Sequence, residues 1–181
     1  MILSETSTQF ILHWGEMGTR WGVNRTVAQV HALLYLSPES LTAEDIAETL
    51  SVARSNVSTS LKELENWRLV QVDSRMGDRR DYFKTSADVW TLFLTVVEQR
   101  VEREIVPTLT MLRSCAVEAR AERPAQPEVA ARITAMQAFL EELLEWYSQI
   151  KKLPPASLRS LVRFGSRVTR ILPKARRRRL D

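Results

Sequence analysis

Small polar side chains occupy the middle of a stretch whose apolar residues recur at helical spacing, LTAEDIAETLSVARSNVSTSLKELEN at positions 41–66. Serine, threonine and asparagine lower helix propensity because their side chains compete for backbone hydrogen bonds. They suit a helix that enters the major groove of DNA, since short polar groups can hydrogen-bond to base edges or phosphates at close approach. The residues in question are Arg54, Ser55, Asn56, Ser58, Thr59 and Ser60.

Taken alone, these residues fit solvated turn and cap positions equally well, so the flanking elements decide between the two interpretations. On the N-terminal side, Thr42 and Asp45 predict a capping box for the short helix AEDIAETL, and SVA is the turn that follows it. On the C-terminal side, RLVQVDS and DYFKT alternate apolar and polar residues around Gly77 and Asp78, which predicts a basic β-hairpin. A helix, a tight turn, a second helix and a basic hairpin in this order predict a winged helix-turn-helix.

The remaining periodicity is mostly helical, and the chain has only five glycines. Residues 5–21 predict a first helix, and Asn24 is a candidate N-cap for a second. Ser51 and Ser55 are candidate caps on either side of the tight turn, and Pro107 should kink or interrupt a later helix. We therefore expect a mainly α protein, in which a winged helix-turn-helix domain with a small β-hairpin wing is followed by C-terminal dimerisation helices.

Reach divides the roles of the side chains that could contact DNA. Arg54 and Asn56 can make bidentate contacts with guanine and adenine, each worth about 1–3 kcal/mol of discrimination. Lys62 lies two turns further along and suits phosphate, and Asp78 would oppose phosphate, so we expect it to orient a neighbouring arginine or cap the turn. The predicted DNA-binding residues are Arg54, Ser55, Asn56, Ser58, Thr59 and Lys62 on the helix, and Arg75, Arg79 and Arg80 on the wing.

Composition and charge exclude several classes of protein. The 181 residues carry a net charge of +4, but residues 151–181 hold 11 Lys and Arg against one acid, so the rest of the chain is acidic. A single cysteine, no glycine-rich phosphate loop and no cluster of metal-ligand residues argue against an enzyme, a cofactor or a metal site. Neither a signal peptide nor a long apolar run is present, so we expect a cytoplasmic protein.

The segment LTAEDIAETLSVARSNVSTSLKELENWRLVQVDSRMGDRRDYF resembles the winged helix-turn-helix of MarR-type bacterial transcriptional regulators. Its flanks, WGEMGTRWGVNRTVAQVHALLYL before it and SADVW after it, look like the GbsR-like branch, and the resemblance covers about residues 5–110. It implies a sequence-specific homodimer that offers one recognition helix to each half-site of a pseudo-palindromic operator in double-stranded DNA. Repression is the commoner outcome when such a dimer occupies a promoter.

The helix predicted over residues 129–150 is apolar over more than one stripe, which exceeds what packing on one small domain requires. We expect it to form the dimer interface, and the alternative is that it covers the helix at 87–106 within the same chain. The candidate dimerisation residues are Phe139, Leu140, Leu143, Leu144 and Tyr147.

A small effector could bind between the DNA-binding lobe and the dimer helices, as the resemblance implies for many relatives. Aromatic residues could form such a pocket, even as a cage for a quaternary ammonium, although this spacing is more often core. The candidate residues are Trp14, Met17, Trp21, Trp90 and Phe93. We expect His13 and His31 to be structural or solvent-facing.

The domains expected are 1–86 for DNA binding, 87–153 for dimerisation and 154–181 as a basic amphipathic tail. The tail could follow DNA phosphates, pack on the dimer or, as the least favoured reading, contact an anionic membrane. It is longer and more basic than the resemblance leads us to expect, so the family assigns it no role. The alternative function is a winged-helix module for protein or membrane-surface binding, anchored by this tail.

Overall fold

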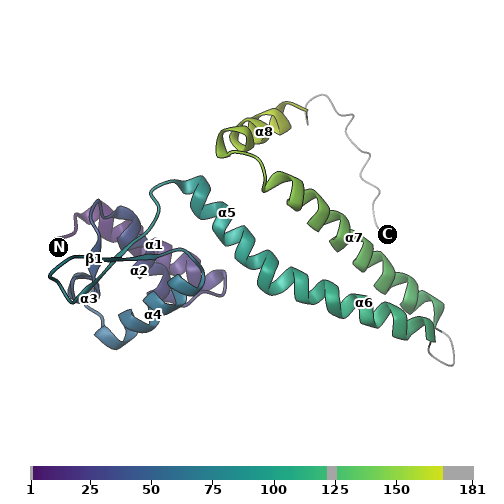
Figure 1. The fold of residues 1–181 in the computed structure, drawn as a ribbon, viewed down its shortest axis with the longest axis horizontal. Coiled ribbons are helices and arrows are strands. Elements are labelled where there is room, and N and C mark those ends of the chain that lie inside the picture. The colour runs from purple at the N-terminus through teal and green to yellow at the C-terminus, as the bar shows by residue number, and fades with distance from the viewer. Residues whose placement is uncertain (1, 122–125, 169–181) are drawn as a thin grey trace. The chain divides into compact units, whose positions relative to one another are not determined.

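The computed structural model describes residues 2–121 and 126–168, which fall into two compact units divided between Arg100 and Val101 (Figure 1). The elements of the first unit are α1 (Glu5–Arg20), α2 (Arg25–Leu36), β1 (Leu41–Thr42), α3 (Ala43–Leu50), α4 (Arg54–Asn66), β2 (Gln71–Ser74), β3 (Asp81–Lys84) and α5 (Val89–Arg100). Those of the second are a π-helical turn η1 (Val101–Ile105), α6 (Val106–Ala121), α7 (Pro127–Ile150) and α8 (Pro155–Val168).

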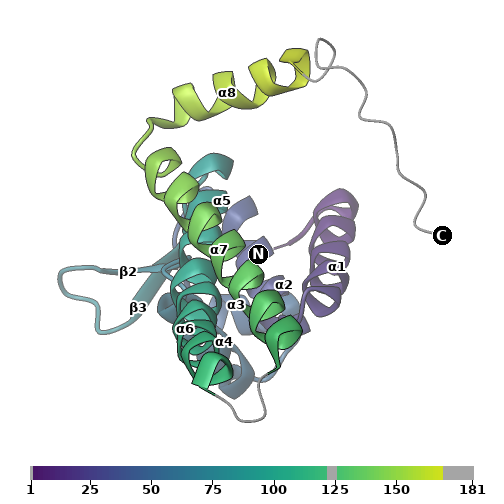
Figure 2. The same ribbon diagram turned by 90° about the vertical axis from the view of Figure 1, so that its right-hand side faces the viewer.

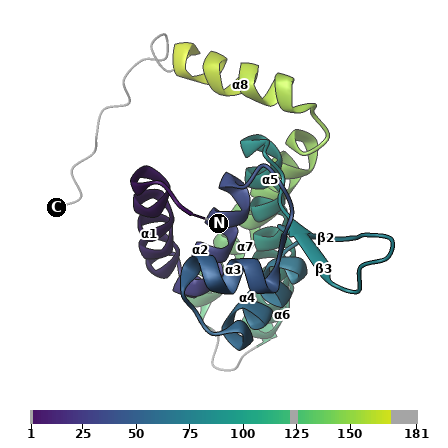
Figure 3. The same ribbon diagram turned by 90° about the vertical axis from the view of Figure 1, so that its left-hand side faces the viewer.

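The core of the first unit lies where α2, α3 and α4 meet, with α1 packed on α2 (Figure 3). Leu33 of α2, Ile46 of α3 and the pair Val57 and Leu61 of α4 are almost completely buried. These apolar residues, with those of α2 and the sheet, form one cluster. The fold is the predicted winged helix-turn-helix, and it leaves the opposite face of α4 to solvent.

Two predicted N-terminal caps are confirmed. The side chain of Asn24 accepts a hydrogen bond from the backbone N–H of Thr26 at 2.8 Å. At the start of α3, the N–H of Asp45 donates to Thr42 Oγ1 at 3.2 Å and the N–H of Thr42 donates to Asp45 Oδ2 at 2.9 Å, which completes the capping box. The hydroxyl of Thr42 also donates to Asp45 Oδ2 at 2.6 Å, and this hydrogen bond, together with that from the Thr42 N–H, holds the pKa of Asp45 below its usual value.

Of the two serine caps predicted for the short helix-turn-helix connection, Ser51 is confirmed as the C-cap of α3 and Ser55 is not a cap. Ser51 ends α3 in the left-handed region, with φ of 54°. The prediction that Ser55 caps the next helix is wrong, because α4 begins at Arg54 with Ala53 as its N-cap and has no side-chain cap. Ser55 instead lies in the first turn of α4, where its side chain is exposed.

A Schellman motif ends α4 and directs the chain into the wing. The N–H of Leu69 donates to the carbonyl of Leu64 at 2.9 Å, and the N–H of Arg68 donates to that of Glu65 at 2.8 Å. Arg68 takes the left-handed position that glycine normally fills, with φ of 55°. An arginine therefore carries backbone strain at this corner.

The wing is the hairpin of β2 and β3, which extends away from the helices in Figure 2. Its sheet has the order β1-β3-β2, because β1 adds an antiparallel strand with Leu41 opposite Phe83 and Thr42 opposite Tyr82. The sequence did not predict β1, since two residues are too few to show a period. This short strand ties the start of α3 to the base of the wing.

In the second unit, α6 and α7 pack side by side (Figure 2), and Arg113 and Glu141 form an ion pair across them at 2.8 Å. The interruption predicted at Pro107 is confirmed, because the π-helical turn comes immediately before α6, in whose first turn Pro107 lies. Residues 169–181, which include most of the basic run of the predicted tail, lie outside the described residues. Within the described ranges, no helix combines the length and apolar character that a membrane span needs.

Candidate nucleic-acid interface and apolar cavity

One face of α4 carries the predicted contact residues. Arg54, Ser55, Asn56, Thr59 and Lys62 are exposed, and Ser58 is half-buried. Ser60 belongs to the opposite face, where it is 2% exposed among the core residues. The helical period thus separates the polar run into an outward set, which matches the predicted set, and one inward serine.

Two of these side chains are already engaged in the free protein. Arg54 Nη2 lies 2.6 Å from Glu44 Oε1 of α3, an ion pair that sequence periodicity does not reveal. Thr59 Oγ1 donates to the carbonyl of Ser55 at 3.1 Å. Because its hydrogen is used within the helix, the Thr59 hydroxyl is left to accept a hydrogen bond.

A three-residue network shapes the wing. Arg80 donates to Asp78 from Nε and from Nη2, with the shorter contact at 2.6 Å, and the hydroxyl of Tyr82 donates to Asp78 Oδ2 at 2.7 Å. These hydrogen bonds hold the pKa of Asp78 well below its usual range and raise that of Arg80. Asp78 therefore orients a neighbouring arginine, which is one of the two roles that the sequence suggested.

The three wing arginines differ in how many contacts their guanidinium groups make within the protein. Arg75 donates to Ser40 Oγ at 3.1 Å, and its guanidinium lies 3.9 Å from the centroid of the Tyr82 ring. Arg80 is held by Asp78, as described above. Arg79 is exposed and makes no hydrogen bond or ion pair within residues 2–121 and 126–168. Arg79 is thus the wing arginine whose charge is available to a partner.

A groove of about 440 Å³ lies between α4 and the wing. It brings together part of the predicted contact set, namely Arg54, Ser58, Lys62, Arg79 and Arg80. Three acids, Glu44, Glu65 and Asp81, line the same groove and nearly balance its positive charge. The other predicted contacts, Ser55, Asn56, Thr59 and Arg75, are exposed residues outside the groove lining.

Comparison with known proteins places this geometry in a family. The sequence model of the MarR family matches residues 21–81, which run from the end of α1 to the wing. Residues 21–81 are a MarR-family domain. Over a longer stretch of the chain, 154 residues align at 18% identity with YvaV of Bacillus subtilis (strain 168), a protein named as a putative HTH-type transcriptional regulator. The alignment covers 84% of this chain and 87% of that protein.

Two further comparisons agree with the family match. The HTH-type transcriptional repressor GbsR of Bacillus subtilis (strain 168) is 24% identical over 92 residues, which is 51% of each chain. The flanking motifs had indicated similarity to the GbsR-like branch of the family. A crystal structure of a transcriptional regulator aligns with a TM-score of 0.61 at 22% identity, over 80% of this chain and 99% of that one. The structural match shows the fold.

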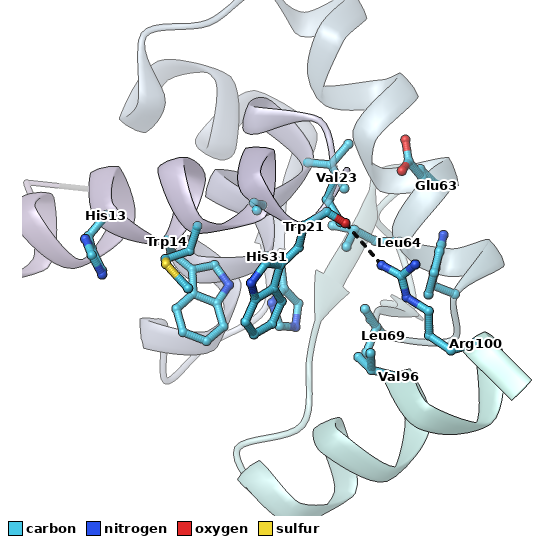
Figure 4. Close-up of a pocket in the computed structure, with 15 residues that line it drawn as sticks. His13, Trp14, Trp21, Val23, His31, Glu63, Leu64, Leu69, Val96 and Arg100 are labelled. Atoms are coloured by element: carbon cyan, nitrogen blue, oxygen red, sulfur yellow. Dashed lines mark hydrogen bonds between the residues drawn. The ribbon is translucent and has the colours of Figure 1, made fainter. Parts of the chain in front are cut away.

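An apolar cavity of about 280 Å³ lies within the first unit, and residues of α1, α2, α4 and α5 line it (Figure 4). Three of the five predicted pocket residues, Trp14, Met17 and Trp21, line it. Trp90 and Phe93 do not, and they instead meet each other edge to face with ring centroids 6.2 Å apart. No group of three or more metal-ligand side chains occurs among the described residues.

The cavity walls include residues that sequence reasoning did not single out as lining. Arg100 of α5 donates to the carbonyl of Trp21 at 3.3 Å, and its guanidinium lies 5.4 Å from the centroid of the Trp67 ring (Figure 4). Leu64 and Trp67 bring the C-terminal end of α4 into the wall, and His31 enters it from α2. These residues come from α2, α4 and α5, which are far apart in the sequence, so no local motif marks the cavity.

The predicted dimerisation residues divide by exposure. Leu140 is buried, Leu144 and Tyr147 are half-buried, and Phe139 and Leu143 are 58% and 38% exposed. Two exposed residues that were not predicted, Met136 and Trp146, fall on the same face of α7. The exposed apolar stripe of α7 is therefore Met136, Phe139, Leu143 and Trp146.

Proposed function

We propose that this chain is a transcriptional repressor that binds double-stranded DNA as a homodimer on a pseudo-palindromic operator. The observation that carries the proposal is the groove shared by α4 and the wing, where Arg54, Lys62 and Arg79 reach one surface. On this geometry, the exposed face of α4 enters the major groove, and the wing contacts the adjacent backbone. Arg54 and Asn56 would read bases, while Lys62 and Arg79 would neutralise phosphates.

The exposed apolar stripe of α7 supports the homodimer. Its four residues recur at spacings of three, four and three, the pattern by which one helix packs against another. A water-exposed stripe of this kind is unfavourable in a monomer, so we assign it to a second copy of the chain. A dimer would present two copies of α4 to half-sites about 34 Å apart, one turn of DNA.

The cavity supports control by a small effector. One of its walls is the end of α4, through Leu64 and Trp67, and the other end of the same helix carries Arg54 and Asn56. A molecule that displaces Trp67 would tilt a rigid 13-residue helix and move its DNA-reading end. Binding in the cavity and binding of DNA would then be coupled through one element.

The decisive experiment is a selection of random duplex DNA on the full chain and, in parallel, on a chain ending at residue 153. A shared inverted-repeat motif supports the proposal and assigns residues 154–181 a supporting role. The variant Arg54→Ala, Asn56→Ala should lose the sequence preference while its circular dichroism stays unchanged. If no motif emerges and all DNA binding disappears with residues 154–181, the proposal is wrong, and the winged helix serves a protein or membrane partner instead.

A further inference from the structure

Helix α8 is already formed in the free chain. It begins directly after Pro154, whose carbonyl accepts hydrogen bonds from the N–H groups of Ser157 and Leu158 at 2.9 and 3.1 Å. In Figure 2 it extends from the end of α7, and none of the helices described in the second unit packs along it. Because the helix needs no ordering, it loses less conformational entropy when it meets a partner.

One side of α8 is apolar and faces solvent. Leu161, Val162 and Phe164 are 44%, 61% and 62% exposed, whereas Leu158, one turn earlier, is buried. At helical spacing, these four residues and Gly165 fall within one half of the helix circumference. Exposed apolar side chains gathered on one side of a helix indicate a surface that binds something.

The opposite side of α8 is basic. Arg159 and Arg163 are exposed and four residues apart, so they lie together on the side away from Leu161. The sequence of α8, PASLRSLVRFGSRV, contains three arginines and no acid. Residues 151–181 as a whole hold 11 Lys and Arg against one acid. Charge complementarity therefore requires a negatively charged partner.

Two of the partners open to α8 would use only half of it. The phosphates of DNA would meet the basic side and leave the apolar side in water, and a second helix would cover the apolar side alone. An anionic lipid surface meets both sides at once, because arginines reach the headgroups while the apolar side enters the acyl boundary.

We propose that α8 docks this protein on an anionic membrane surface, with the helix axis in the plane of the headgroups. The sequence made this the least favoured of three readings. The exposure of Leu161, Val162 and Phe164 changes that order, since neither DNA nor solvent favours them. The docking site lies in the second unit, so it is additional to DNA binding and does not depend on it.

The test is flotation of the full chain with lipid vesicles in a density gradient, without DNA. One set of vesicles contains equal parts of phosphatidylcholine and phosphatidylglycerol, and the other contains phosphatidylcholine alone. We expect binding to the neutral vesicles to be at least about tenfold weaker, because each arginine near an anionic surface adds about fivefold.

Single substitutions on the apolar side separate lipid from other partners. Val162→Asp should weaken binding to the anionic vesicles at least about tenfold, since it removes an apolar contact and adds a charge that the headgroups repel. Val117→Asp on α6 is the matched control, because Val117 is 66% exposed, and it should float like the wild type. Gly165→Leu should bind several-fold more tightly, since a Cβ at this position meets nothing within 4 Å and the leucine enlarges the apolar side.

Absence of flotation with the anionic vesicles would overturn the proposal, as would equal flotation of the Val162→Asp and Val117→Asp variants. If Arg159→Gln, Arg163→Gln lowers affinity for a random duplex and leaves flotation unchanged, the basic side serves DNA and the proposal is wrong. It is also wrong if Val162→Asp floats like the wild type but sediments as a smaller species, because α8 then packs on a second copy. None of these vesicle results decides the DNA selection, and failure of that selection leaves the flotation result intact.

Discussion

Arg54, the first residue of α4, and Glu44 of α3 form an ion pair with 2.6 Å between Nη2 and Oε1. Both side chains are largely exposed, at 68% and 44%, so the pair contributes little to folding. Its consequence is for DNA binding, because the arginine that we propose reads a guanine is held by a carboxylate that also repels phosphate. Glu44 therefore restricts where Arg54 can act.

We expect Glu44→Gln to raise affinity for any duplex several-fold and to lower the ratio of operator to random-sequence binding. The freed arginine can then reach phosphates as well as a base edge. Glu65→Gln is the matched control, since it removes an acid from the same groove without touching Arg54. Fluorescence anisotropy on both duplexes measures the two affinities. Identical ratios in the two variants would show that Glu44 acts only through its charge.

The wing arginines should separate in the same assay. Arg79→Ala should reduce the slope of log affinity against log salt by about 0.9, because one phosphate contact is lost. Arg80→Ala should instead loosen the turn, seen as faster amide hydrogen exchange over residues 78–82, because it frees Asp78 and Tyr82. Equal exchange rates in the two variants would contradict the division into a contact residue and a structural one.

The order of the helices and the wing and the N-caps of α2 and α3 could be predicted because they depend on local chemistry. Asn24 and Thr42 accept hydrogen bonds from backbone N–H groups within three residues of themselves. The alternation of apolar and polar residues before Gly77 is visible in the seven residues RLVQVDS. Contacts between different helices and strands could not be predicted in this way, because no local sequence pattern marks them. Glu44 and Arg54 are ten positions apart on different helices, and nothing in either helix marks them as a pair.

The cavity and α7 also show that helical periodicity does not tell which side chains are buried in the folded protein. Trp14 and Trp90 both sit in aromatic patterns at helical spacing, yet only Trp14 lines the cavity, because tertiary packing decides which face is covered. In α7 the apolar residues cover more than one stripe. Periodicity therefore could not tell the buried Leu140 from the exposed Phe139 beside it.

Arg68→Gly should stabilise the protein by about 1 kcal/mol. A non-glycine residue in the left-handed region costs about 1–2 kcal/mol, and part of that gain is offset by the greater freedom of glycine in the unfolded chain. Urea unfolding followed by circular dichroism measures the change. Lys62→Gly, in the interior of α4, should lose about 1 kcal/mol and serves as the control. A destabilised Arg68→Gly variant would show that the arginine side chain outweighs its backbone strain.

The two faces of α7 can be distinguished by sedimentation velocity. Leu143→Glu, in the exposed apolar stripe, should weaken self-association by at least about thirtyfold, since a carboxylate would be buried against the second copy. Ala138→Glu places the same charge at an exposed position of α7 outside the stripe and should leave the assembly unchanged. If both variants sediment like the wild type, the stripe is not the dimer interface.

Acid should destabilise the fold through His31. Its pKa is lowered from 6.5 to about 4 by burial, so between these pH values the unfolded chain binds a proton that the folded chain does not. The free energy of unfolding therefore falls as pH drops through this window, by up to about 1.4 kcal/mol per pH unit. His31→Phe should remove this part of the slope, and His13→Phe, at the exposed histidine of the same cavity, should retain it. Urea midpoints measured from pH 7 to pH 4 test this, and equal slopes in the two variants would mean that His31 is protonated in the folded protein.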